Sequence, residues 1–295
     1  MTDSLTPSEE FEQPATPETA QPCQPDSPGL LQSVVLIGLA LVLTIAVGIG
    51  ELSLEALEID VSSWSATAAA NVVGMGLVVL WAVRRTGLAR SLVLPFGSFP
   101  PLLLLPLLLF ALGCTIVCSE IDNLVRLALP TPEWLMEVFL EMMNGSWESF
   151  VALVVVAPLT EELLFRGVIL RGLIIQRGVW SGILWSAFLF AAFHLNPWQF
   201  VAAFPVGIAL GWLFVRSGSL WPCILLHAAF NSSAFLAGAG YFDATRFSIP
   251  GFNSDPTGPV LLQPLAFDAL GFALLAVGIV WMTKIFDRAA QPASA

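Results

Sequence analysis

Residues 149–175 read SFVALVVVAPLTEELLFRGVILRGLII, an apolar run long enough to cross a lipid bilayer as a helix. Three charged side chains stand near the middle of this run, at Glu161, Glu162 and Arg166. A charged group at the centre of a bilayer costs roughly 2.5–3.5 kcal/mol on insertion scales, so such residues are usually functional. The segment therefore predicts a membrane-spanning helix that carries a functional site.

The rest of the chain is similarly apolar. Of the 295 residues 57% are hydrophobic and only 11% are charged, whereas about 25% of the residues of a soluble domain are charged. Further apolar stretches predict membrane spans at 29–50, 66–84, 99–118, 178–194, 199–216, 219–237 and 265–283. We therefore expect an all-α, polytopic membrane protein with about eight transmembrane helices.

Two tails and a surface helix are expected around these spans. Residues 1–28 contain no Lys or Arg and are rich in Pro, Glu, Gln, Ser and Thr, which predicts a disordered acidic tail. The transmembrane domain is expected at 29–285, with a short C-terminal tail at 286–295. Between 133 and 143, glutamates recur every four residues opposite an apolar side, which predicts an external amphipathic helix on the membrane surface.

The distribution of Lys and Arg predicts the orientation of the spans, because cytoplasmic loops contain the excess of these residues. With eight spans, only Arg126 and Arg246 fall on one side of the membrane. The other side receives Arg84, Arg85, Arg90, Arg171, Arg177, Arg216, Lys284 and Arg288. Both termini are therefore expected in the cytoplasm.

Helical geometry separates the charged residues of the 149–175 segment. Glu162 and Arg166 are four residues apart and share a face, so we expect an ion pair that supports the helix. Glu161 points about 100° away from Glu162 and has no partner on its own helix. A carboxylate without a cation in a low dielectric accepts a proton readily, which suits a general base. Pro158 removes a helical hydrogen bond and is expected to open the backbone near Glu161.

The only two histidines, His194 and His227, both fall in predicted spans, and Asn231 shares a helix face with His227. A glutamate and a histidine can activate a water molecule, while a second histidine and an asparagine can donate hydrogen bonds to an oxyanion. Alternatively, Glu161, His194 and His227 could bind zinc with an open position for water. Either arrangement fits hydrolysis of a peptide bond within the membrane.

Structural roles compete with these functional ones. Paired charges inside a helix bundle are often only structural, a buried histidine is often a satisfied core residue, and Asn231 could merely bond across helices. Glu161 is the residue for which a structural role is hardest to find, because it lacks an obvious partner.

These residues resemble the CPBP family of intramembrane proteases, also called the Abi family, which includes type II CAAX prenyl endopeptidases and bacteriocin-processing or self-immunity proteins. The EExxxR motif of the family corresponds to residues 161–166, its FxxxH motif to 190–194 and its HxxxN motif to 227–231. The resemblance covers about residues 150–235. Each motif is weak alone, but three in this order, each in its own span, are specific.

The resemblance implies a role for each motif residue. Glu161 and His194 would activate the water, His227 and Asn231 would form the oxyanion site, and Glu162 and Arg166 would support them. The cofactor stays open between a divalent metal such as zinc and a metal-free glutamate mechanism. An HExxH motif is absent and asparagine is a poor zinc ligand, which leans slightly against an obligatory zinc.

We therefore expect an intramembrane endopeptidase in a bacterial plasma membrane. Its partners would be the lipid bilayer and a membrane-associated peptide or protein, of which a prenylated CAAX-type substrate is one example. No basic patch indicates nucleic acid. Two other functions fit the same residues: a non-proteolytic scaffold or bacteriocin-immunity protein on the same fold, and a proton-coupled transporter that uses Glu161, His194 and His227 as a relay.

Overall fold

The computed structural model describes residues 27–55, 63–86, 94–238, 249–252 and 258–290. Within these ranges the chain forms helices joined by turns and contains no strand, so the all-α prediction is confirmed. The helices are α1 (Leu30–Glu55), α2 (Ser63–Thr86), α4 (Leu104–Ala128), α5 (Glu133–Met142), α6 (Trp147–Phe150), α7 (Ala157–Glu162), α8 (Arg171–Arg177), α9 (Val179–Phe193), α10 (Pro197–Ser217), α11 (Leu220–Gly238) and α13 (Leu265–Ala290), with a 3-10 turn, η1, at Pro101–Leu103.

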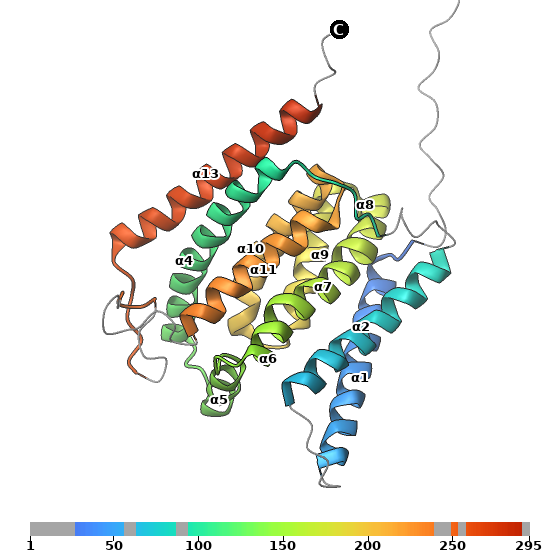
Figure 1. The fold of residues 1–295 in the computed structure, drawn as a ribbon, viewed down its shortest axis with the longest axis horizontal. Coiled ribbons are helices and arrows are strands. Elements are labelled where there is room, and N and C mark those ends of the chain that lie inside the picture. The colour runs from blue at the N-terminus through green and yellow to red at the C-terminus, as the bar shows by residue number, and fades with distance from the viewer. Residues whose placement is uncertain (1–26, 56–62, 87–93, 239–248, 253–257, 291–295) are drawn as a thin grey trace, which may run out of the picture.

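The helices lie side by side in one bundle (Figure 1). The antiparallel pair of α1 and α2 covers one flank, and the pair of α4 and α13 covers the other. The chain from α6 to α11 lies between the two pairs, where it packs against both α2 and α4. The residues of the predicted site are therefore all on the central helices.

Five helical segments of the described chain are long and apolar enough to cross a membrane: Leu30–Val47, Pro101–Ala128, Pro197–Ser217, Leu220–Ala237 and Leu265–Ala289. The predicted count of eight is not confirmed, because the stretches at 66–84, 149–175 and 178–194 are not among these five. The last of the three forms α9, which is apolar but only 15 residues long. The stretch at 149–175 is divided into several shorter helical pieces.

This divided run, from Trp147 to Arg177, switches from an α helix to a π helix at two places. It is π-helical at η2 (Val151–Val156) and again at η3 (Leu163–Leu170), and α7 lies between these two segments. Pro158 is the second residue of α7. It cannot donate a backbone hydrogen bond and its ring crowds the preceding turn, which is the π-helical segment η2. π-Helical turns are rare in proteins, and those that do occur are often found at functional sites.

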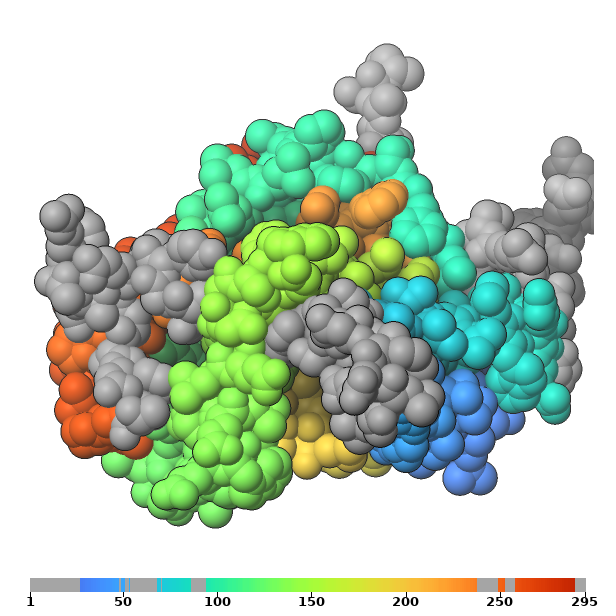
Figure 2. Space-filling view, turned by 60° about the horizontal axis from the view of Figure 1, so that its bottom comes forward, coloured from blue at the N-terminus to red at the C-terminus, as the bar shows by residue number. Residues whose placement is uncertain are grey.

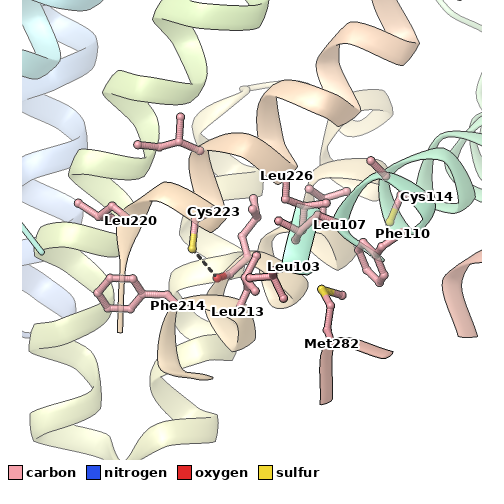
Figure 3. Packing of buried hydrophobic residues seen from close by; sticks show 14 of the residues in the cluster. Leu103, Leu107, Phe110, Cys114, Leu213, Phe214, Leu220, Cys223, Leu226 and Met282 are labelled. Carbon is pink, nitrogen blue, oxygen red and sulfur yellow. Dashed lines mark hydrogen bonds between the residues drawn. The ribbon is translucent and has the colours of Figure 1, made fainter. Parts of the chain in front are cut away.

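Two groups of buried apolar side chains fix the positions of the central helices. One group joins α4, α10, α11 and α13 around Leu107, Phe110 and Leu213 (Figure 3). Cys223 belongs to this group as a small buried side chain, and its thiol donates to the carbonyl of Leu210 at 3.5 Å. The second group joins α1, α2, η3 and α9 around Phe165. The run from Trp147 to Arg177 therefore has packing partners on both sides.

The amphipathic helix predicted at 133–143 is present as α5, over Glu133–Met142. Its glutamates are exposed and Leu135 is buried. Trp134 is 65% exposed, so the apolar side is only partly covered by protein. Figure 2 shows this green segment at the edge of the molecule, where it lies on the surface of the bundle. Such a helix suits a membrane surface.

The tails differ in how much of them is described. Residues 1–26 of the predicted acidic tail lie outside the described residues, whereas Ser27 and Pro28 lie against α8, where Gln176 Nε2 donates to the Ser27 carbonyl at 3.0 Å. At the other end α13 continues to Ala290, beyond the expected domain boundary at 285. The ends of α2, α8 and α13 that contain Arg85, Arg177 and Arg288 point toward the same end of the bundle (Figure 1).

Close approach of α4 and α13 makes Gly113 a sensitive position. A Cβ atom there would lie 2.7 Å from the Gly271 carbonyl oxygen, whereas at Gly38 it would meet nothing within 4 Å. We expect Gly113→Ala to lower the free energy of unfolding by roughly 1–3 kcal/mol through overpacking. Gly38→Ala should be neutral or stabilising by up to about 1 kcal/mol through helix propensity. Thermal unfolding in detergent measures both, and equal shifts in the two variants would contradict this packing.

Candidate active site

The Glu162 and Arg166 side chains form an ion pair in the middle of the bundle. Arg166 Nη1 donates to Glu162 Oε1 at 2.8 Å, and both side chains are fully buried. The contact follows from their spacing, because residues four apart lie on one helix face. Two buried charges cost free energy to remove from water, so the pair is stable only with further polar contacts around it.

Arg166 obtains such contacts from two other helices. Its Nη2 donates to the Gly207 carbonyl of α10 at 3.1 Å, and its guanidinium lies 4.6 Å from the ring centroid of Phe190 on α9. A Cβ atom on Gly207 would lie 3.0 Å from Ala187 Cα, so the small residue lets α10 approach α9 closely. The guanidinium therefore joins three elements at one point.

Glu162 also binds His227 of α11. His227 Nδ1 lies 2.8 Å from Glu162 Oε1, the same oxygen that accepts from Arg166. A carboxylate paired with a guanidinium is ionised and only accepts hydrogen bonds, so the imidazole proton is assigned to Nδ1. This bond fixes the ring and turns Nε2 away from Glu162.

Glu161 faces that second nitrogen. Its Oε2 lies 3.8 Å from His227 Nε2, too far for a hydrogen bond. The residue is only 8% exposed, and Oε2 has no hydrogen-bond partner among the described residues. The two neighbouring glutamates thus lie on opposite sides of one imidazole, with Glu162 binding it and Glu161 left able to accept a proton.

His194 lies at the end of α9, where its backbone leaves the helix. Its Nδ1 is 3.0 Å from the Phe190 carbonyl oxygen. The Phe190 ring makes edge-to-face contacts with both histidines, at centroid distances of 5.3 Å to His194 and 5.6 Å to His227. Among the described residues no hydrogen bond or ion pair joins His194 to Glu161 directly. The Phe190 ring therefore contacts both histidines and lies between α9 and α11.

The turn after His194 is strained. Leu195 has φ +57°, a left-handed conformation that side chains other than glycine adopt at a cost. Asn196 follows it, caps α10 by accepting from the Gln199 amide at 2.8 Å and donates to the His194 carbonyl at 2.9 Å. Strained backbone of this kind clusters at functional sites. Here it lies directly after His194, where α9 ends, and so fixes the position of that residue.

Asn231 bonds across helices. Its Nδ2 donates to the Leu153 carbonyl at 2.9 Å, and Leu153 belongs to the π-helical segment η2. This contact positions the amide on the same face of α11 as His227. The amide nitrogen has a second hydrogen that this bond does not use.

The part of the chain that contains these residues is similar to a known protein family. Residues 144–233 match the family of type II CAAX prenyl endopeptidase Rce1-like proteins. We refer to residues 144–233 as the Rce1-like segment because of this similarity. It begins just before α6 and ends within α11, so it includes Glu161, His194, His227 and Asn231. No curated protein and no solved structure matches the chain.

The Rce1-like segment does not gather the three residues considered as zinc ligands. The described residues contain no group of three or more His, Cys, Asp and Glu side chains placed to bind a metal ion. These residues as arranged therefore do not fit a three-ligand zinc site.

Two contacts within the Rce1-like segment were beyond sequence reasoning. Glu162 binds His227 across 65 positions, and Asn231 binds Leu153 across 78. Helical spacing relates residues of one helix only, so it could not relate α7 to α11. The only sequence signal for the first contact was Glu162 itself. Its spacing on the helix predicted a pair with Arg166 but gave no indication of a second partner.

Neutralising Glu162 should destabilise the protein strongly. Glu162→Gln keeps the shape of the side chain but leaves the Arg166 guanidinium buried without a counter-charge, so we expect a loss of roughly 3–5 kcal/mol in the free energy of unfolding. Arg216→Ala is the matched control, because Arg216 pairs with Asp287 at the surface, where the two side chains are 35% and 57% exposed. That variant should lose less than about 1 kcal/mol. Equal losses in denaturant titrations would refute a special role for the buried pair.

Proposed function

We propose that this protein is an intramembrane endopeptidase that hydrolyses a peptide bond in a membrane-associated peptide or protein. The observation that supports it most is the buried Glu161 carboxylate inside the Rce1-like segment. Its Oε2 lies beside His227 and has no hydrogen-bond partner among the described residues. The family description names CAAX prenyl endopeptidases, so a prenylated CAAX-type peptide is the first substrate class to test.

Proton transfer is the role we propose for Glu161. Oε2 accepts a proton from a water molecule as the water oxygen attacks the carbonyl carbon of the scissile bond. The same proton then passes to the amide nitrogen as the carbon–nitrogen bond breaks, which releases an amine and a carboxylic acid. His194 orients the water through Nε2, since its Nδ1 lies against the Phe190 carbonyl. No step of this reaction needs a metal ion.

His227 and Asn231 supply hydrogen bonds to the tetrahedral oxyanion in this proposal. His227 Nδ1–H is committed to Glu162, so its ring donates to the oxyanion only when Nε2 also carries a proton. Asn231 donates through the amide hydrogen that Leu153 does not use. Glu162 and Arg166 position His227 and do not touch the substrate.

The alternative functions rest on the same ionisable residues. A proton-coupled transporter or a non-proteolytic scaffold would also need buried charges, but the match of residues 144–233 to an endopeptidase family does not favour either. We propose that the basic end of the bundle lies in the cytoplasm of a bacterial cell, with both termini there, and that substrate reaches the site from that side.

Loss of the Glu161 carboxylate should abolish cleavage. We expect Glu161→Gln and His194→Ala to lower the rate of cleavage by about 10²–10⁴-fold, the typical contribution of a general base. The assay uses purified protein in lipid vesicles with a peptide that ends in a prenylated CAAX-type sequence. Glu137→Gln, on the exposed side of α5, should retain full activity. A Glu161→Gln enzyme as active as the wild type would remove Glu161 from the mechanism.

Metal removal tests the cofactor separately. Because the described residues form no group of three metal ligands, we expect cleavage to survive thorough chelation. Zinc content measured by mass spectrometry should stay well below one ion per chain. Activity that disappears on chelation and returns with added zinc would overturn the metal-free mechanism.

A further inference from the structure

A groove lies between the start of α1 and the end of α2, away from the candidate active site. Its volume is about 210 Å³. Leu31, Gln32 and Val35 line it from α1, and Trp81 and Arg85 line it from α2. The α1–α2 pair forms one flank of the bundle (Figure 1), so the groove belongs to its periphery.

The polar end of this groove contains a fixed cation. The Arg85 guanidinium lies 5.5 Å from the ring centroid of Trp81, so it stacks on the indole. Gln32 Oε1 accepts from the Gly29 amide, which leaves its amide hydrogens available as donors. Arg85 lies in the last turn of α2, at the basic end of the bundle. This end of the groove therefore suits a negatively charged group that accepts hydrogen bonds.

Apolar side chains form the rest of the groove. Leu31 is 77% exposed and Val35 is 58% exposed, and both lie on the first two turns of an apolar helix that is long enough to cross a membrane. A cation at one end and an apolar wall along the helices together match an amphipathic molecule. Pockets of this kind between membrane helices on the cytoplasmic side bind anionic lipid headgroups.

We propose that the α1–α2 groove binds one anionic phospholipid. Its phosphate pairs with Arg85, its headgroup accepts from Gln32, and an acyl chain lies along Leu31 and Val35. A zwitterionic phospholipid is a poorer ligand because its ammonium group meets the Arg85 guanidinium. The acidic residues 1–26 are a poorer fit as well, because they contain no run of apolar residues to cover the wall.

The test measures lipid binding and not cleavage, so its outcome is independent of the protease proposal. The purified full chain is titrated with phosphatidylglycerol or phosphatidylcholine of identical acyl chains, and bound lipid is counted by native mass spectrometry. We expect wild type to prefer phosphatidylglycerol by about fivefold, the ratio for one arginine near an anionic lipid. Arg85→Ala should lose this preference. Arg84→Ala is the matched control, since Arg84 is the exposed neighbour outside the groove lining, and it should retain the preference.

A second variant tests the apolar wall and covers the case in which Arg85→Ala fails to fold. Val35→Trp fills the groove and keeps both arginines, so it should lower the binding of both lipids by a similar factor. Equal lipid preference in Arg85→Ala and Arg84→Ala would overturn the proposal. Unchanged binding in Val35→Trp would overturn it as well, because it would place the lipid elsewhere.

Discussion

The buried ion pair of Glu162 and Arg166 is the constraint on which the centre of this protein depends. Both side chains are fully buried in a bundle of apolar helices, where an unpaired charge would cost several kcal/mol. The pair therefore has to be surrounded by polar contacts before the helices can close around it. Gly207, Phe190 and His227 supply those contacts, each from a different helix.

Meeting this constraint also arranges the chemistry. Arg166 and His227 both bind Glu162 Oε1. The hydrogen bond that helps to satisfy the buried carboxylate therefore also orients the imidazole. Glu161, one residue earlier, cannot share that bond because it points to another face. Its Oε2 atom lies at the other edge of the same ring and has no hydrogen-bond partner among the described residues. Structural support and candidate catalysis are thus divided between two adjacent glutamates.

Local patterns in the sequence predicted what depends on local geometry. The helical class follows from apolar runs, the Glu162–Arg166 pair from spacing on one helix, and α5 from its alternating faces. Window hydropathy could not predict the winding of the chain, so the eight expected spans are not confirmed. Pro158 indicated an opened backbone, but not that two π-helical segments would flank α7. Contacts between helices far apart in the chain, such as Glu162 with His227, have no signature in spacing.

Because the chain contains only two histidines, the protonation of His227 can be read directly. Nitrogen NMR of protein labelled with ¹⁵N-histidine gives two ring signatures, and His194→Ala leaves that of His227 alone. The account predicts a proton on Nδ1, with a signal that shifts when Glu162 is replaced by Gln. A ring protonated only on Nε2, or one that does not respond to Glu162→Gln, would contradict the claim that the buried pair positions His227.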